Sequence, residues 1–554
     1  MNEVRIFALG GLDEDGKNLT VVEINQDIFV IDVGLKYPDK DRLGVEIIIP
    51  DFSYLIENKN RIKGIFITHG HDDAMSALPY LIRQTDLPIF TTPLTAKLIE
   101  RLFKEEKITQ YSLKVLKRDD SLQIGKINIR TFSLTHSIAD AFGVAIESPF
   151  GYIVYAGEYI IDFNTRNQAF SCDITSFADI GKKGVFALLT ESVGADRPGY
   201  TAPNHSITEF VEDVLEDTKN RVIVTMYEQN LFRLLELLEL AKKYKRKVFF
   251  YNDEQRELLR LAESLGYYKM PLDLELSKSK FNNNIDNLMI IVSGSGPQVF
   301  KLMHKIAMSE DDVISLSTSD TVIIASPIVP GTEREAGRME NELYKEDVNV
   351  VTLDRKKVVS MHASIEDIKM LVYLLKPKYF IPIHGEYRHL VNNATIALDM
   401  GYYADKIVVL DNGQIATFKE GKLNNTANIL KLEEILIDGN AHLDSSGLIL
   451  KDRELLSTDG VIVIGVVLNF NTKEVIGGPD VQSRGVIYLK DADYIVKEVG
   501  NIMENTINSM VEANRYDNMS ARNEAKEKMT KYILKETGKR PMVLPVIVEI
   551  NLSE

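Results

Sequence analysis

Two histidines and an aspartate alternate directly after an apolar segment near the start of the chain. The run 65–67 has the β-branched and aromatic character of a buried strand, and His69, His71 and Asp73 follow it. Because a strand end holds alternate positions within a small volume, these side chains can converge on one ion. Neutral imidazole and carboxylate are typical ligands of Zn²⁺ and Mn²⁺. The chain has only nine histidines, so two within three positions favour a metal site over a polar loop with incidental histidines.

The elements that must position this loop change in type along the chain. The first 200 residues read as short β-branched strands and turns, joined further on by helices. From about residue 204, amphipathic helices alternate with short strands such as 222–227 and 247–252, which predicts an α/β insert with a parallel sheet. Strands return near residue 348. A segment that looks like a linker, 425–447, precedes a last unit of two strands, two helices and one strand.

Five further polar motifs follow the first loop, and each contains a histidine or a glutamate. In chain order they are Leu134-Thr135-His136-Ser137, Tyr155-Ala156-Gly157-Glu158, Thr190-Glu191-Ser192, Ser360-Met361-His362 and Ile383-His384-Gly385-Glu386-Tyr387. Together with His69-x-His71-x-Asp73, this ordered set resembles the metallo-β-lactamase superfamily and, within it, the β-CASP branch that processes nucleic acids. The resemblance is strongest to bacterial ribonuclease J and covers essentially the whole chain. The ordered set is specific, although each motif alone would be weak.

The resemblance implies an α/β fold of three parts. These are a metallo-β-lactamase αββα sandwich, an inserted β-CASP α/β domain and a small α+β C-terminal domain. The expected boundaries are 1–202 for the first part of the metallo-β-lactamase domain, 203–350 for the β-CASP domain, 351–425 for the second part of the metallo-β-lactamase domain, 426–447 for a linker and 448–554 for the C-terminal domain.

The resemblance also implies a site for two metal ions, with one carboxylate as the bridge between them. All expected ligands are imidazoles or carboxylates: His69, His71, His136 and Glu158 for the first ion, and Asp73, Glu158 and His384 for the second. These nitrogen and oxygen donors suit Zn²⁺ and Mn²⁺ alike.

Three positions depart from the family pattern. The signature ends in a histidine where this chain has Ala74, the bridge is normally an aspartate rather than Glu158, and Met361 replaces a glycine. An alanine methyl supplies no donor, and the longer glutamate displaces its carboxylate by about 1 Å, whereas metal sites tolerate about 0.2 Å. The pattern is most similar to the second, catalytically weakened ribonuclease J that Firmicutes carry beside a more active paralogue. We therefore expect one tightly bound ion or fewer; the alternative is that Asp72 or a water fills the gap.

The resemblance assigns roles beyond the metal ligands. Asp73 would be a catalytic residue as well as a ligand, and His362 would donate a proton or a hydrogen bond to an oxygen of the scissile phosphate. Glu191 would orient either His384 or His362. A pocket for a 5′-monophosphate would lie in the β-CASP domain, built from backbone amides and hydroxyls that bind phosphate without base preference. Its expected residues are Val358, Val359, Ser360, Met361, His362, Ser293 and Ser295.

Three functions stay open on the sequence alone. The first is a metal-dependent 5′–3′ exoribonuclease, with or without endoribonuclease activity, that is intrinsically weak and acts in rRNA maturation and mRNA decay. The second is a largely inactive RNA-binding scaffold subunit that assembles with an active ribonuclease J paralogue. The third, a small-molecule hydrolase, is disfavoured by the large insert with its own motifs. The implied partners are RNA with a 5′-monophosphate end, a second copy or a paralogue, and components of an RNA degradosome.

Composition sets outer limits on these functions. The chain has 81 acidic and 65 basic residues, a net charge of −16, which argues against a histone-like coat for nucleic acid but not against a local basic channel. Cys172 is the single cysteine, which excludes an internal disulfide and a cysteine-rich zinc site and is typical of a reducing cytosol. No apolar run approaches the roughly 20 residues that span a bilayer, and no signal-like segment is recognisable. A cytoplasmic protein without membrane contact is therefore expected.

Overall fold

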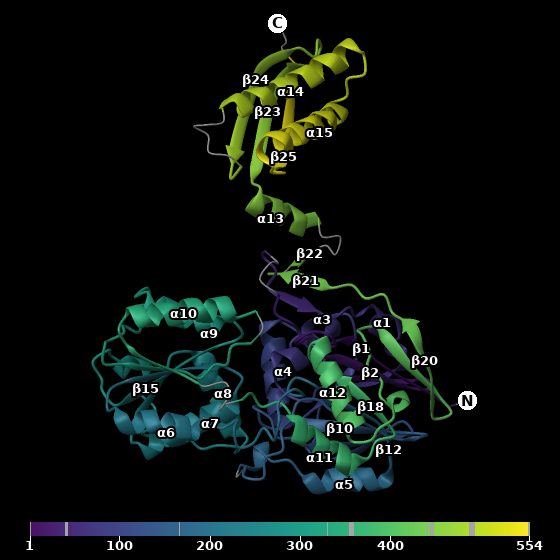
Figure 1. The fold of residues 1–554 in the computed structure, drawn as a ribbon, viewed down its shortest axis with the longest axis vertical. Coiled ribbons are helices and arrows are strands. Elements are labelled where there is room, and N and C mark those ends of the chain that lie inside the picture. Colours follow the sequence, from purple (N-terminus) through teal and green to yellow (C-terminus); the bar gives the residue numbers. More distant parts are fainter. Residues whose placement is uncertain are drawn as a thin grey trace. The chain divides into compact units, whose positions relative to one another are not determined.

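The computed structural model describes residues 2–38, 43–165, 167–329, 331–353, 359–439, 441–443, 448–486 and 493–551. By their contacts, these residues divide into two units, one of residues 1–39 and 46–437 and one of residues 40–45 and 438–554 (Figure 1). Among the described helices, none is both long enough and apolar enough to cross a membrane.

Two β-sheets, packed face to face, form the centre of the first unit. The larger sheet has the strand order β20 (Lys422–Ile429), β19 (Gln414–Lys419), β1 (Glu3–Gly10), β2 (Leu19–Ile24), β3 (Asp27–Ile31), β5 (Ile62–Phe66), β6 (Pro88–Thr91), β7 (Ser112–Val115). The smaller sheet has the order β18 (Tyr379–Ile383), β12 (Val185–Glu191), β11 (Gly151–Ala156), β10 (Phe142–Ser148), β9 (Ile127–Ser133), β8 (Ser121–Ile124). Alternate residues of each strand face the other sheet, so Phe29 and Phe66 share one core with Phe142 and Val144.

Helices cover the outer face of each sheet and complete the αββα sandwich (Figure 1). The larger sheet carries α1 (Ser53–Glu57), α3 (Leu78–Ile82) and α4 (Pro93–Glu105), and the smaller carries α5 (Ile174–Lys183), α11 (Ile365–Leu375) and α12 (Tyr387–Asp399). The sequence of α4 explains its placement. Leu94, Leu98 and Ile99 recur at helical spacing and are buried against the sheet, whereas Lys97 and Glu100 pair on the surface at 2.8 Å.

The insert, teal in Figure 1, is a second α/β layer between β12 and β18. Its strands all run parallel in the order β14 (Lys247–Phe250), β15 (Leu288–Gly294), β13 (Val222–Tyr227), β16 (Thr321–Ile324), β17 (Asn349–Thr352). One face packs on α6 (Thr208–Asp217), α7 (Leu231–Lys243) and α8 (Asp253–Ser264), and the other on α9 (Gln298–Ala307) and α10 (Glu333–Lys345). Because β13 is covered on both faces, its apolar run is nearly unbroken. The parallel sheet predicted for the insert is confirmed.

After the insert, the chain returns to both sheets of the sandwich. β18 pairs in parallel with β12, and β19 pairs antiparallel with β1. The segment 426–447, expected to be a linker, instead contains strands. β20 continues through Ile429 as the partner of β19, and β21 (Ile435–Asp438) pairs with β4 (Ile47–Ile49). The polar, asparagine-rich sequence of β20 carries no strand signal, because β20 is the edge strand of the sheet and most of its side chains stay in solvent.

The second unit contains a three-stranded sheet with helices on one face. Its strand order is β24 (Val475–Arg484), β23 (Val461–Asn469), β25 (Met542–Ile550), and the helices on its face are α14 (Asp493–Glu512) and α15 (Asn518–Thr537). A further helix, α13 (Leu448–Thr458), precedes β23. Ile462, Ile464 and Leu468 of β23 alternate into the core under α14 and α15. The opposite face exposes apolar side chains: Val463, Ile476, Leu544, Val546, Val548 and Ile550. An exposed apolar sheet face of this kind needs a partner surface.

Candidate active site

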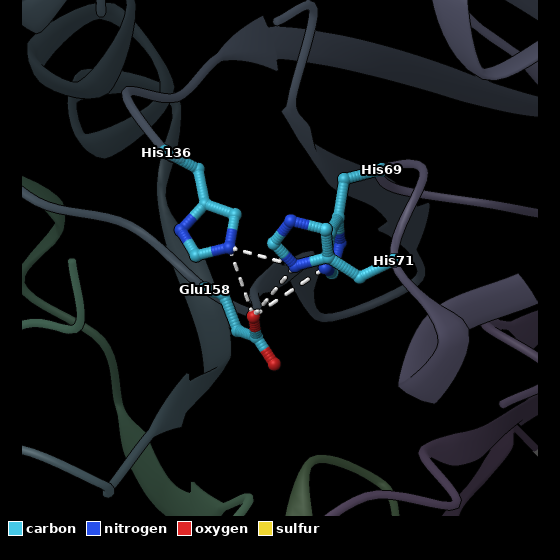
Figure 2. A group of neighbouring side chains, drawn as sticks. All are labelled: His69, His71, His136 and Glu158. Atoms are coloured by element: carbon cyan, nitrogen blue, oxygen red, sulfur yellow. Dashed lines mark hydrogen bonds and ion pairs between the residues drawn. The ribbon is translucent and has the colours of Figure 1, made fainter. Parts of the chain in front are cut away.

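Three histidines and one glutamate, brought together from separate strands, form a cluster (Figure 2). His69 and His71 lie on the loop after β5, His136 follows β9, and Glu158 follows β11. Each offers one ligand atom, and these atoms all lie within 4.8 Å of one another. The structure thus joins the first histidine loop to two motifs that are more than sixty residues away in the chain.

The distances within this cluster match a tetrahedral ion. Glu158 Oε2 lies 3.0 Å from His136 Nε2, 3.4 Å from His69 Nε2 and 3.9 Å from His71 Nδ1. His71 Nδ1 and His136 Nε2 are 3.2 Å apart. Donors that are about 2.0 Å from a tetrahedral Zn²⁺ lie about 3.3 Å from one another. The four donors therefore surround a space of the size that a zinc ion needs.

Hydrogen bonds on the outer side turn the bare imidazole nitrogens inward. His136 Nδ1 lies 3.0 Å from the Met361 carbonyl oxygen, which can only accept, so Nδ1 carries the proton and Nε2 has a free lone pair. His69 Nδ1 contacts Thr68 Oγ1 at 2.9 Å, and the Thr68 hydroxyl donates to Asp32 Oδ1 at 2.9 Å. Thr68 Oγ1 is then the acceptor for His69 Nδ1–H. Partners of this type fix the tautomer of metal-binding histidines.

Burial favours the neutral form of His69 and His71, as metal binding requires. It lowers the pKa of His69 to about 3 and also lowers the pKa of His71, whose Nε2 contacts Ser137 Oγ at 3.2 Å. Burial opposes ionisation of Glu158, but the facing imidazoles outweigh it, and the pKa of Glu158 falls well below its usual range. His69 Nε2 is buried without a hydrogen-bond partner, a costly state that a bound cation relieves. The donor set thus fits a divalent metal ion.

The other oxygen of Glu158 faces a second group of side chains. Glu158 Oε1 lies 3.9 Å from His384 Nδ1. His384 Nε2 contacts the Tyr155 hydroxyl at 2.9 Å, and that hydroxyl donates to Asp32 Oδ2 at 2.8 Å. Because the single hydroxyl proton of Tyr155 goes to Asp32, His384 Nε2–H is the donor to Tyr155, and Nδ1 is bare. Glu158 is therefore placed between His384 and the three-histidine cluster.

Asp73 is on the same side, and Ala74 follows it. Asp73 Oδ1 lies 3.9 Å from His69 Nε2, and Asp73 Oδ2 accepts from the Asn18 side-chain amide at 3.0 Å. The Ala74 methyl is fully buried and offers no donor. Asp72 does not fill the gap, because its carboxylate oxygens are occupied by other groups: Gln229 Nε2 at 2.9 Å, Ser76 Oγ at 2.8 Å and the Tyr37 hydroxyl at 2.7 Å.

His362 stands next to the cluster with its own carboxylate partner. Its ring centroid is 5.8 Å from that of His136, and its Nδ1 lies 2.7 Å from Glu191 Oε2. Glu191 is fully buried, and its Oε1 also accepts from the backbone amides of Tyr159 and Ala363, both at 2.9 Å. Of the two histidines left open for Glu191, it contacts His362. Burial would lower the pKa of His362, but the Glu191 carboxylate outweighs burial and raises it to about 9.

The expected phosphate-binding residues only partly share one cavity. A cavity of about 290 Å³ between the sandwich and the insert is lined by four of the expected ligands, His71, Asp73, His136 and Glu158, together with Ser295, Ser360, Met361 and His362. Ser360 accepts hydrogen bonds from the Arg197 guanidinium through its carbonyl oxygen, at 3.2 Å. The remaining expected residues lie elsewhere: Val359 lines a smaller neighbouring cavity, Ser293 is buried at the end of β15 with its hydroxyl unpaired, and Val358 lies outside the described residues.

Relatives of known family match almost the entire chain. Ribonuclease J 2 of Staphylococcus aureus (strain NCTC 8325 / PS 47) is 31% identical over 555 residues, covering 99% of this chain and 98% of the relative. Ribonuclease J 2 of Staphylococcus epidermidis is 31% identical over 553 residues with the same coverage. The chain belongs to the ribonuclease J family.

Family models for separate segments agree with this membership. They match a beta-lactamase superfamily domain at 49–175, a ribonuclease J beta-CASP domain at 219–343, a Zn-dependent metallo-hydrolase RNA specificity domain at 348–398 and a ribonuclease J C-terminal domain at 448–550. A crystal structure of a protein of unknown function from Enterococcus faecalis V583 shares the fold, with a TM-score of 0.53, 15% identity, and coverage of 76% of this chain and all of that one. The chain is thus an RNA-processing metallo-hydrolase of the ribonuclease J family.

Several residues that support this ribonuclease J site are absent from the sequence predictions. Asp32 is the hub, since it accepts from Thr68 on the His69 side and from Tyr155 on the His384 side. The one sequence signal for Asp32 is that an acidic residue directly follows the apolar strand β3. In the structure, its backbone is left-handed, with a φ of 61°. Arg197, which contacts Ser360, has no such signal, because its partner is more than 160 residues away.

We expect Glu191→Gln to move the alkaline limit of RNA decay to lower pH. In the parent protein, His362 is protonated below a pKa of about 9, so activity that needs the imidazolium falls as pH rises through that value. With an uncharged glutamine at position 191, no carboxylate opposes the effect of burial on His362. Loss of an opposite charge at this distance lowers the pKa of the imidazole by about two units. The pH profile of kcat/KM on RNA measures the shift. An unchanged alkaline limb would show that His362 does not act as a cation.

Proposed function

We propose that the chain is a metal-dependent 5′–3′ exoribonuclease with weak intrinsic activity, also able to cut internally, that acts in rRNA maturation and mRNA decay. One observation carries the proposal: His362, whose Nδ1 contacts the buried carboxylate of Glu191 at 2.7 Å, lines the same cavity as His71, His136 and Glu158 of the cluster. A metal-ligand cluster alone fits many hydrolases. The added imidazolium supplies a donor for the oxygens of a phosphodiester.

In this proposal, each side chain has one task. A divalent ion held by His69, His71, His136 and Glu158 would activate a water and offset the charge of the phosphate. His362 would donate from its free ring nitrogen to a phosphate or leaving oxygen, with Glu191 holding the ring. Ser295 and the segment around Ser360 would take the terminal 5′-monophosphate, because they line the same cavity as the cluster. Contacts of this type are to the backbone and do not read the bases.

We expect a low rate of RNA cleavage because a second metal ion would be held weakly. Asp73, Glu158 and His384 offer a second ion fewer donors than the family pattern, because Ala74 has none. A poorly held ion contributes less charge stabilisation, and each 1.4 kcal/mol of barrier is about a factor of ten in rate. We propose that one ion, Zn²⁺ or Mn²⁺, stays tightly bound in the histidine cluster.

The alternative is a largely inactive subunit that binds RNA and assembles with an active ribonuclease J paralogue. The exposed apolar face of the C-terminal sheet, with Val546 and Val548 at 40% and 48% exposure, supports assembly with a second copy or such a paralogue. It does not separate the two proposals, because an active enzyme can also assemble.

RNA decay with defined 5′ ends tests the proposal. The zinc-loaded chain is incubated with one RNA that carries a 5′-monophosphate and the same RNA with a 5′-triphosphate. We expect slow release of mononucleotides from the monophosphorylated RNA and release at least tenfold slower from the RNA with a 5′-triphosphate. After treatment with a chelator, we expect no release from either RNA. RNA that is bound but stays intact with metal present would instead favour the scaffold subunit.

A further inference from the structure

The loop after β1 lies against both turns that carry the second group of ligands. The Glu14 amide donates to the Gly385 carbonyl at 3.2 Å, directly beside His384. Four residues later, the Asn18 amide donates to the Asp73 carbonyl at 3.0 Å, and the Asn18 side chain donates to Asp73 Oδ2. These bonds hold residue 15 across the gap between His384 and Asp73.

Asp15 lies on this loop, between the two residues that make these backbone bonds. It lines the cavity with Asp73, Glu158 and His362. In the part of the chain that the structure describes, its carboxylate makes no hydrogen bond and no ion pair. Lys36 is near, but its Nζ is 3.6 Å from Glu14 Oε2 and forms its ion pair there. A carboxylate in this position has oxygens available for a ligand.

A buried nitrogen independently points to a ligand at the same place. His384 is 3% exposed, and its Nδ1 has no hydrogen-bond partner. That nitrogen faces Glu158 Oε1 at 3.9 Å, the oxygen turned away from the three-histidine cluster. An unpaired buried nitrogen costs free energy unless something binds it.

We propose that Asp15 supplies the donor that Ala74 does not, and that Asp15, Asp73, Glu158 and His384 form a second site for a hard divalent cation such as Mn²⁺ or Mg²⁺. Three carboxylates and one imidazole favour such ions over Zn²⁺, which the histidine cluster suits better. Because Asp15 lies on an exposed loop, this site binds more weakly than the first. The inference rests on the proposed metal-dependent function and extends it: the chain holds two unlike ions, and the second binds more weakly than the first.

Manganese binding to the zinc-loaded chain tests this site without any measurement of activity. The full chain is loaded with Zn²⁺, freed of loosely held metal, and titrated with Mn²⁺ while electron paramagnetic resonance records free Mn²⁺. We expect one Mn²⁺ per chain in the parent protein and at least tenfold weaker binding in Asp15→Asn. The matched control is Glu386→Gln, which removes a nearby surface charge that does not line the cavity, and we expect its binding to stay within about twofold.

Equal manganese affinity of Asp15→Asn and the parent, or a parent chain that takes up no Mn²⁺ beside Zn²⁺, would overturn the inference. An equal loss in Glu386→Gln would also overturn it, because the effect would then be one of net charge rather than of ligation. Asp15-dependent Mn²⁺ binding in a chain that leaves RNA intact would support this inference and contradict the proposed ribonuclease activity, so the two can fail separately.

Discussion

His136→Ala should abolish tight zinc binding and slow RNA decay by about a thousandfold. His136 is the member of the cluster whose Nε2 is nearest to Glu158, at 3.0 Å, and its tautomer is fixed by the Met361 carbonyl. Without this nitrogen, the four-donor site keeps three donors and is open to the cavity. The activation barrier of phosphodiester cleavage then rises by several kcal/mol, because the metal no longer assists the reaction. Elemental analysis after gel filtration and the rate of RNA decay measure both effects.

The matched control is His304→Ala, in helix α9 of the insert, which lies outside the cluster and outside the cavity. We expect its zinc content and RNA decay to equal those of the parent. If His136→Ala keeps one zinc per chain and decays RNA at the parental rate, the cluster is not the metal site of the reaction.

The second large effect should come from restoring the family pattern with Ala74→His together with Glu158→Asp. We expect turnover on 5′-monophosphorylated RNA to rise at least tenfold, with a second metal ion retained through gel filtration. The new imidazole adds a neutral donor beside Asp73, and the shorter carboxylate returns the bridge to its usual length. Since Ala74 is fully buried, the larger side chain also costs roughly 1–3 kcal/mol of stability, visible as a lower unfolding temperature.

Ala74→Leu with Glu158→Asp is the control for size, because leucine fills a similar volume and offers no donor. It should lose stability as the histidine variant does and gain neither metal nor rate. If the histidine variant binds a second ion tightly and turnover does not rise, the weakness lies elsewhere, at Met361 or at the loop that contains Ser293.

The parts of the site that follow strands could be predicted from the sequence. His69 and His71 alternate after an apolar run, and the ordered motifs led to His136 and Glu158, which the structure brings into the same cluster. The roles of these residues stay predictions until they are tested. The parallel sheet of the insert could be predicted too, because buried strands and amphipathic helices each leave a periodic pattern. The αββα sandwich was implied by the family resemblance rather than by periodicity.

The parts that depend on long-range contacts could not be predicted. Asp15 is one acidic residue in a polar turn, and only the backbone bonds from Glu14 to Gly385 and from Asn18 to Asp73 show that its loop lies beside the turns that carry His384 and Asp73. Strand β20 could not be predicted for a related reason: it is an edge strand held by hydrogen bonds to β19, and its own sequence has no strand pattern. Sequence periodicity indicates which side chains are buried, and the side chains of Asp15 and of most of β20 are not buried.

Anomalous diffraction at the zinc absorption edge, from crystals of the full chain grown with Zn²⁺, tests the central claim most directly. A single strong peak about 2 Å from His69 Nε2, His71 Nδ1, His136 Nε2 and Glu158 Oε2 is the result that we expect. A map with no peak among these four atoms, or with zinc held only at other residues, would contradict the metal site and the chemistry proposed for it.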